Sequence, residues 1–190
     1  MAQLATTSMT SLWTPDNATP CTILVETGVD GLLAHLGHRL CLRVHDYRVE
    51  LRRGHVSALM RSDSLRVEGV LREGQCATGV LSRRDVEKIE ALLRSDILTS
   101  ARWSDIRYEA LVTSHDDPGS LTCAGDLTLR GVTRPMALCG RLSAERATLS
   151  GSLAQSAWGI TPYSALAGQL RVADTITVRI EAALPRERAR

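Results

Sequence analysis

LTCAGDLTLRGVTRPMAL, residues 121–138, carries the clearest structural signal in this chain of 190 residues. Before its turn, apolar side chains alternate with polar ones, at Leu121, Cys123, Leu127 and Leu129. A period of two is typical of a strand with one buried face. The step Arg130-Gly131 then favours a turn, and Met136 and Leu138 resume the alternation beyond it. The stretch therefore predicts an antiparallel hairpin.

The same alternation recurs on both sides of this hairpin. The further segments that show it are residues 40–44, 47–52, 65–67, 106–112, 149–153 and 176–182. Turn signals lie between them, at Arg53-Gly54 and in the run Asp116-Asp117-Pro118-Gly119. Counting the two arms of the hairpin, the chain has about eight predicted strands. Their short connections favour antiparallel neighbours.

A single stretch, SRRDVEKIEALLRSDIL, has helical spacing instead. Its apolar residues at helical intervals are Val86, Ile89, Leu92, Leu93 and Ile97. Ser82 is followed three positions later by Asp85, a pattern that favours the start of a helix. We expect one helix from about residue 83 to about residue 95.

Strands with one apolar face must cover those faces against one another, as barrels and sandwiches do. An eight-strand barrel is either filled by side chains or holds one small ligand. The chain contains no Phe and only 3% aromatic residues, so its core must be mainly aliphatic. We therefore predict an all-β, antiparallel barrel of about eight strands with one short α-helix and an elongated, aliphatic cavity.

Composition excludes several classes of function. The net charge of +2, with Lys88 as the only lysine, does not predict a nucleic-acid partner. No apolar run approaches the roughly 18 residues of a membrane span, and the N-terminal residues lack a secretory pattern. We expect a cytoplasmic protein without stable membrane insertion. Five cysteines without a CxxC pair are expected to be free thiols: Cys21, Cys41, Cys76, Cys123 and Cys139.

The domain organisation follows from composition as well. Residues 1–19 are rich in Thr, Ser, Ala and Pro and show no period, so we expect a flexible leader. Residues 20–185 form one predicted β-barrel domain, and residues 186–190 a charged C-terminal stub.

Several motifs also carry a resemblance to a known family. The hairpin stretch is similar to a strand, a GVTRP turn and the next strand of that family. Other similar segments are residues 31–51 with a GH step, residues 96–110 after the helix, and residues 155–184 with a WGITPY turn. On these motifs the chain resembles the YceI family of lipid- or polyisoprenoid-binding β-barrels. Tyr108 stands where the family has an aromatic residue, and Trp158 replaces its usual Phe.

The resemblance implies a lipocalin-like antiparallel barrel whose long pocket takes an apolar chain, in known members an isoprenoid. It implies no catalytic mechanism and no cofactor. The expected function is binding, transport or sequestration of an amphipathic lipid. Two alternatives stay open: an enzyme that holds an apolar substrate in the same barrel, and a stress-related barrel with a filled core and a protein partner.

Candidate ligand contacts follow from the alternation and from the scarce aromatic residues. The predicted pocket lining is Leu40, Leu42, Tyr108, Leu127, Leu129, Trp158, Tyr163, Ile176 and Val178. His38, in the GH step, is expected at a polar mouth. The residues expected to face solvent are Arg39, Arg43, Thr128 and Arg179.

Metal and catalytic sites are not predicted. His35, His38, Cys41 and His45 are residue types that bind zinc, but positions three apart on a strand point to opposite faces. Cys41 alternates with Leu40 and Leu42, as the arginines on either side of it do, so it is expected on the charged face of its strand. Nucleophile-elbow, HExxH and phosphate-loop patterns do not occur in the sequence, so we expect no catalytic residues.

Overall fold

The hairpin that opens the sequence analysis lies at the centre of the fold in the computed structural model, which describes residues 11–16, 21–31, 34 and 37–184. Its arms are β10 (Ser120–Leu129) and β11 (Val132–Leu142). Arg130 and Gly131 form the turn with φ of 50° and 74°, the left-handed backbone that a tight two-residue hairpin needs. A Cβ at position 131 would also lie 2.5 Å from the Trp103 ring, so only glycine fits there.

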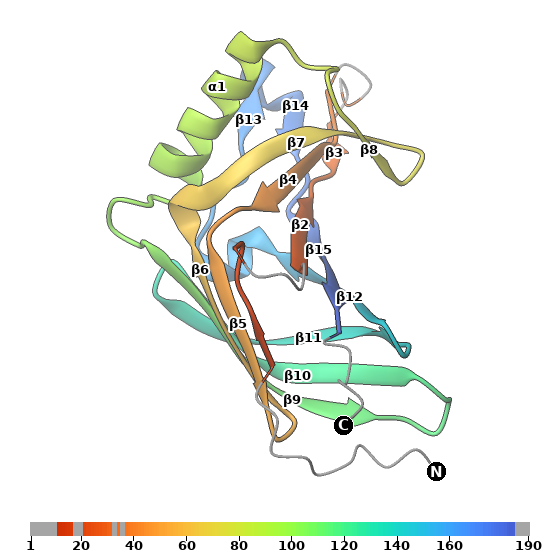
Figure 1. Ribbon diagram of the computed structural model, residues 1–190. Helices are drawn as coiled ribbons and strands as arrows, with labels where there is room; N and C mark the ends of the chain where they lie inside the picture. Colours follow the sequence, from red (N-terminus) through yellow and green to blue (C-terminus); the bar gives the residue numbers. More distant parts are fainter. Residues whose placement is uncertain (1–10, 17–20, 32–33, 35–36, 185–190) are drawn as a thin grey trace.

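Twelve strands form one antiparallel sheet. Besides the hairpin these are β1 (Ser11–Trp13), β2 (Cys21–Glu26), β4 (Leu40–Val44), β5 (Tyr47–Arg52), β6 (His55–Arg61), β7 (Leu65–Arg72), β8 (Gln75–Ala77), β9 (Asp105–Ser114), β12 (Arg146–Ala154) and β15 (Thr175–Ala183). Their order across the sheet is β1-β5-β6-β9-β10-β11-β12-β15-β2-β4-β7-β8 (Figure 1). A smaller sheet joins β13 (Ser164–Ala165), β14 (Leu170–Val172) and β3 (Val29–Asp30).

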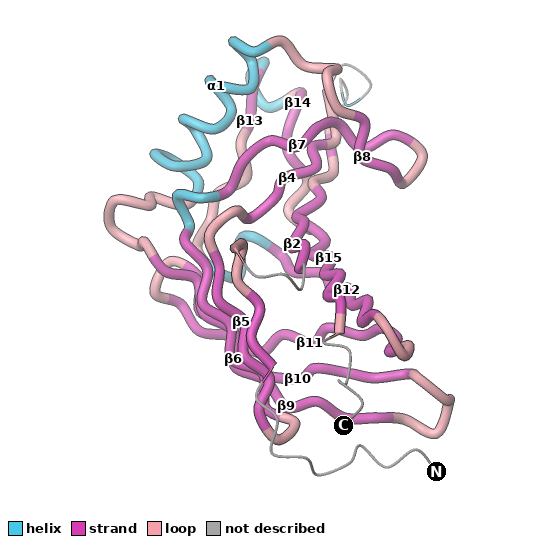
Figure 2. The backbone as a smooth tube through the Cα atoms, in the orientation of Figure 1, coloured by secondary structure: helices cyan, strands magenta, loops and turns pink. Residues whose placement is uncertain are grey.

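The predicted closed barrel of about eight strands is wrong. The sheet is a strongly curled half-barrel with β1 and β8 as its two edges (Figure 2). The difference arises from one long bent hairpin: only His45 and Asp46 separate β4 from β5, and only the 3₁₀ turn η2 (Ser62–Ser64) separates β6 from β7. At these bends β5 and β6 join one half of the sheet while β4 and β7 join the other.

The single α-helix begins where the sequence predicts it. α1 (Arg83–Leu92) is extended by one π-helical segment, η3 (Leu93–Ile97). The Asp85 amide donates a hydrogen bond of 3.2 Å to the Ser82 hydroxyl, which confirms the predicted N-cap. The helix lies beside β7, where the Val67 amide donates to the Glu90 carboxylate at 3.1 Å (Figure 1).

Two local features differ from the sequence expectations. Residues 11–13 fall in the predicted leader, but they form β1 and pair with β5. Cys41 is fully buried rather than on a charged face, because the pairing of β4 with β7 shifts between Cys41 and Leu42. Cys41 pairs with Gly69 of β7, and burial raises the pKa of its thiol to about 12. The predicted C-terminal stub lies outside the described residues.

Candidate ligand-binding site

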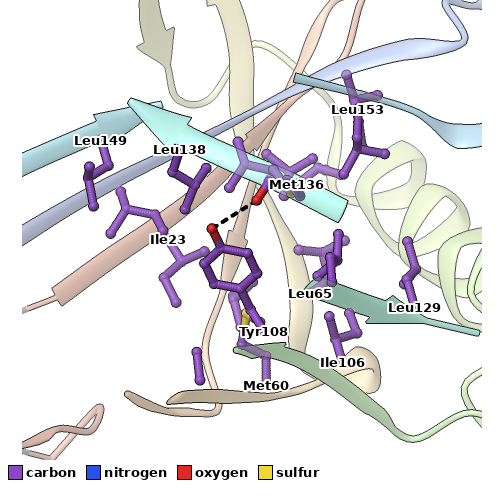
Figure 3. A pocket seen from close by; sticks show the side chains of 18 of the residues that line it. Ile23, Met60, Leu65, Ile106, Tyr108, Leu129, Met136, Leu138, Leu149 and Leu153 are labelled. Carbon is purple, nitrogen blue, oxygen red and sulfur yellow. Dashed lines mark hydrogen bonds between the residues drawn. The ribbon is translucent and has the colours of Figure 1, made fainter. Parts of the chain in front are cut away.

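The concave side of the curled sheet, together with α1, encloses a cavity of about 600 Å³. This volume lies within the roughly 300–1,000 Å³ typical of small-molecule sites. Its walls are almost entirely aliphatic, with Leu, Ile, Val, Ala and Met from most strands of the large sheet. Figure 3 shows part of this wall, with Ile23, Leu138 and Leu149 on one side of Tyr108 and Met60 on the other.

Most of the predicted lining residues lie on this cavity. They are Leu40, Leu42, Tyr108, Leu127, Leu129, Tyr163, Ile176 and Val178, with His38 at the rim. Arg39 and Arg179 are exposed, and Arg43 and Thr128 are half-buried away from the cavity wall. The apolar residues therefore face the cavity and the polar residues between them face away from it, as the alternation predicts. Whether these residues contact a ligand stays a prediction.

Trp158 is the exception, because it is not among the residues that line the cavity. It belongs to η4 (Gln155–Trp158) and is only 4% exposed. Its indole nitrogen donates a hydrogen bond of 3.1 Å to the Leu127 carbonyl, which holds the ring in the packed core.

Tyr108 contributes its ring to the cavity and keeps its hydroxyl in the wall. The hydroxyl donates to the Cys123 carbonyl at 2.7 Å and lies 3.2 Å from the Met136 carbonyl (Figure 3). Burial raises the pKa of this phenol, so it stays neutral at physiological pH. Tyr108 therefore acts as an apolar wall rather than as a free polar contact.

Two aromatic side chains join strands that are far apart in the sheet. The Trp13 indole nitrogen on β1 donates a hydrogen bond of 2.8 Å to the Ala183 carbonyl on β15. The Tyr47 hydroxyl on β5 donates to the Cys21 carbonyl on β2. We call Trp13 and Tyr47 the aromatic latch, because they connect the β1–β5 edge to β15 and β2. Trp13 also lines the cavity and is only 4% exposed.

Sequence reasoning did not identify Trp13 as a cavity residue. It lies in a short segment without hydrophobic periodicity. The neighbouring residues give no indication of a partner 170 residues away. The one available signal was its residue type, since Trp13 is one of three tryptophans in a chain without Phe.

The polar lining residues gather at one end of the cavity. They are Thr27, His38, Asp85, Lys88, Gln155 and Tyr163. Thr27 follows β2 and bonds to Leu40 at the start of β4, and Gln155 bonds to Ala173, next to β14. Figure 1 draws α1, β13 and β14 at the same end of the molecule. His38, Lys88 and Tyr163 are exposed, so this end reaches solvent.

The cysteines of the cavity wall are electrically neutral. Burial raises the pKa of the Cys21 thiol to about 11, and burial likewise raises the pKa of Cys123. A thiol that keeps its proton at neutral pH is a poor nucleophile and metal ligand. Cys21 and Cys123 therefore act as small hydrophobic groups in the wall.

The residue types considered as zinc ligands do not come together. His38 is exposed at the rim, Cys41 is buried against Cys76, His45 is exposed, and His35 lies outside the described residues. Within the described ranges no three His, Cys, Asp or Glu side chains group as a metal site would require. Among the same residues, no helix is both long and apolar enough to cross a membrane.

The fold and the cavity define a class: a curled antiparallel sheet with an apolar interior that opens at one polar rim. A YceI-like domain model matches residues 49–184, more than half of the chain, so the protein belongs to the YceI-like domain family. A comparison with curated proteins finds no relative of significant similarity.

Solved structures with the same fold come from several bacteria. A polyisoprenoid-binding domain from Saccharophagus degradans is 14% identical, with a TM-score of 0.56 and coverage of 94% of this chain and 100% of that one. Burkholderia cenocepacia BcnA is 9% identical, with a TM-score of 0.57 and coverage of 87% and 96%. The Campylobacter jejuni YceI protein is 14% identical, with a TM-score of 0.54 and coverage of 77% and 85%. At these identities the likeness concerns the fold alone.

Proposed function

We propose that this protein binds an amphipathic lipid, most simply an isoprenoid chain, in the cavity of the curled sheet and thereby transports or sequesters it without catalysis. The observation that carries the proposal is the cavity of about 600 Å³ with aliphatic walls and a polar rim at one end. The lipid tail lies against the aliphatic wall, and the head lies at the rim with His38 and Tyr163. The Saccharophagus degradans neighbour, described as polyisoprenoid-binding, supports this ligand class.

The energetics favour this ligand. Each buried methylene contributes about 0.8 kcal/mol of transfer free energy. A few isoprene units therefore give micromolar affinity after the costs of association. No charged side chain of the described residues lines the cavity except Asp85 and Lys88 on α1, so a tail meets no unpaired charge further in.

The two alternatives lose support from the same geometry. A filled-core barrel with a protein partner does not have an interior of this volume. An enzyme needs reactive groups at the substrate, whereas the Tyr108 hydroxyl is bonded within the wall and Cys21 is held neutral by burial.

Binding of a neutral fluorescent probe, N-phenyl-1-naphthylamine, tests the proposal together with native mass spectrometry for a co-purified lipid. We expect the wild type to bind the probe and Leu129→Trp, which fills the cavity, to lose that binding at a stability cost of about 1–3 kcal/mol. Leu111→Trp is the matched control, because Leu111 is 62% exposed and does not line the cavity. A folded wild type that binds neither probe nor lipid refutes the proposal, and turnover of the bound lipid supports the enzyme alternative.

A further inference from the structure

The cavity-facing side of α1 contains one cation and one carboxylate beside apolar residues. Asp85, Lys88, Ile89 and Leu92 are spaced three, four and seven residues from the first, and all four line the cavity. A lysine in such a stripe lays its methylene stem on the apolar surface and keeps its ammonium group at the water boundary. Lys88 therefore presents a positive charge at the point where a bound lipid would end.

Lys88, like Arg84 on the same helix, has no ion-pair partner among the described residues, whereas two neighbouring arginines are paired. Arg83 pairs with Glu87 at 2.9 Å and Arg94 with Glu90 at 3.7 Å. Within residues 37–184 and the other described segments, no carboxylate pairs with Lys88, and no other Lys or Arg lines the cavity. The rim thus has a single cation that is free to bind a ligand.

The acidic neighbour on the stripe is already engaged. The Ser82 hydroxyl donates to the Asp85 carboxylate at 2.7 Å. Asp85 lies in the first turn of α1, where the positive end of the helix dipole favours a carboxylate. Its negative charge is therefore offset locally, whereas the charge of Lys88 is not.

We propose, building on the proposed function, that the lipid head is anionic and that the Lys88 ammonium group contacts it, with His38 as a second hydrogen-bonding group on the rim. A carboxylate and a phosphate monoester share the required chemistry. Both accept charge-assisted hydrogen bonds from an ammonium group. This assignment makes Lys88 a specificity-determining residue and fixes the direction in which the lipid enters, head last.

Four ligands with one common chain and different heads test the assignment: geranylgeranoic acid, geranylgeranyl phosphate, geranylgeraniol and geranylgeranylamine. Each displaces N-phenyl-1-naphthylamine from the wild-type protein at neutral pH and moderate salt. We expect the acid, the phosphate or both to bind about three- to tenfold more tightly than the alcohol, since the contact is partly exposed to water. The amine should bind most weakly. The acid and phosphate arms identify which anion the rim prefers.

Three variants distinguish a direct contact of Lys88 with the lipid head from a general effect of positive surface charge. Lys88→Gln should remove the preference for the anionic heads and leave the affinity for the alcohol unchanged, while Lys88→Arg keeps the preference. Arg84→Gln is the control, because Arg84 is an exposed cation of the same helix that does not line the cavity. Both positions are exposed, so we expect all three variants to fold.

Two results overturn the assignment while the proposed function stands: equal affinity for alcohol, acid and phosphate, or a preference that persists in Lys88→Gln. Failure of all four lipids to displace the probe refutes lipid binding itself and the assignment with it.

Discussion

The two flanks of the cavity are held together in different ways. On one flank β9, β10 and β11 pair continuously, with ten paired positions between β10 and β11 and eight between β10 and β9. On the other, the β1–β5 edge is connected to β15 and β2 by the aromatic latch, in which Trp13 bonds to Ala183 and Tyr47 bonds to Cys21. On the first flank, many backbone hydrogen bonds connect the strands. On the second, the side chains of Trp13 and Tyr47 supply the hydrogen bonds across to β15 and β2.

This difference predicts where the molecule opens. Removing one side chain from the continuous ladder leaves its backbone bonds in place. Removing one latch residue deletes a side-chain hydrogen bond between the β1–β5 edge and strands β15 and β2. We call the side with β9, β10 and β11 the ladder flank and the side with Trp13 and Tyr47 the latch flank. We expect the latch flank to control how long a ligand stays in the cavity, and the ladder flank to contribute mainly to the free energy of unfolding.

Trp13→Ala is expected to have the largest effect on stability and on ligand release. Loss of a buried indole should lower the free energy of unfolding by about 3–5 kcal/mol. Because Trp13 also lines the cavity and bonds across its open flank, the variant should release N-phenyl-1-naphthylamine faster than the wild type. Denaturant unfolding and stopped-flow fluorescence measure the two effects.

Trp158→Ala is the matched control for this prediction. Trp158 is also 4% exposed and also donates its indole N–H to a backbone carbonyl, but it does not line the cavity. We expect a comparable loss of stability with an unchanged release rate. Equal release rates in both variants contradict a special role for the latch flank.

Alkaline pH gives the second test, through Cys21 on the latch flank. Burial raises the pKa of this thiol from 9.0 to about 11. Below pH 9 the thiol is protonated in both the folded and the unfolded chain and does not make stability depend on pH. Between pH 9 and about 11 only the unfolded chain loses the proton, so the free energy of unfolding should fall by about 1.4 kcal/mol per pH unit.

Cys21→Ala isolates this effect. The variant starts from a lower stability at neutral pH, but its stability should fall less steeply than that of the wild type between pH 9 and 11. Cys139→Ala is the control, because Cys139 is exposed. Identical slopes for the wild type and Cys21→Ala contradict a buried, protonated thiol at this position.

The alternation of apolar and polar residues predicted the strands of the ladder flank. The alternation in residues 121–138 fixed which side chains face the cavity, because a slip of one residue would turn the buried leucines to solvent. The pairs Arg53-Gly54 and Arg130-Gly131 marked real turns in which both residues have positive φ. A third such pair, Glu73-Gly74, is not predicted from the sequence, since the strand after it has only three residues and shows no period.

The latch flank escaped prediction because its contacts are not local. No pattern around Trp13 indicates a partner 170 residues later. The bends at residues 45–46 and 62–64, which turn a closed barrel into a half-barrel, do not interrupt the alternation enough to be seen in the sequence. Position in space, not residue type, likewise decided that Tyr163 lines the cavity and Trp158 does not.

The smallest test compares one hydroxyl on each flank. Tyr47→Phe removes the bond to the Cys21 carbonyl, and Tyr108→Phe removes the bond to the Cys123 carbonyl. Both phenols are buried, and each loss should cost about 0.5–1.5 kcal/mol of unfolding free energy. Only Tyr47→Phe breaks a connection across the latch flank, so only this variant should release the probe faster, whereas the β9–β10–β11 ladder holds the wall around Tyr108. Faster release from Tyr108→Phe than from Tyr47→Phe would show that wall packing, and not the latch, limits how long a ligand stays bound.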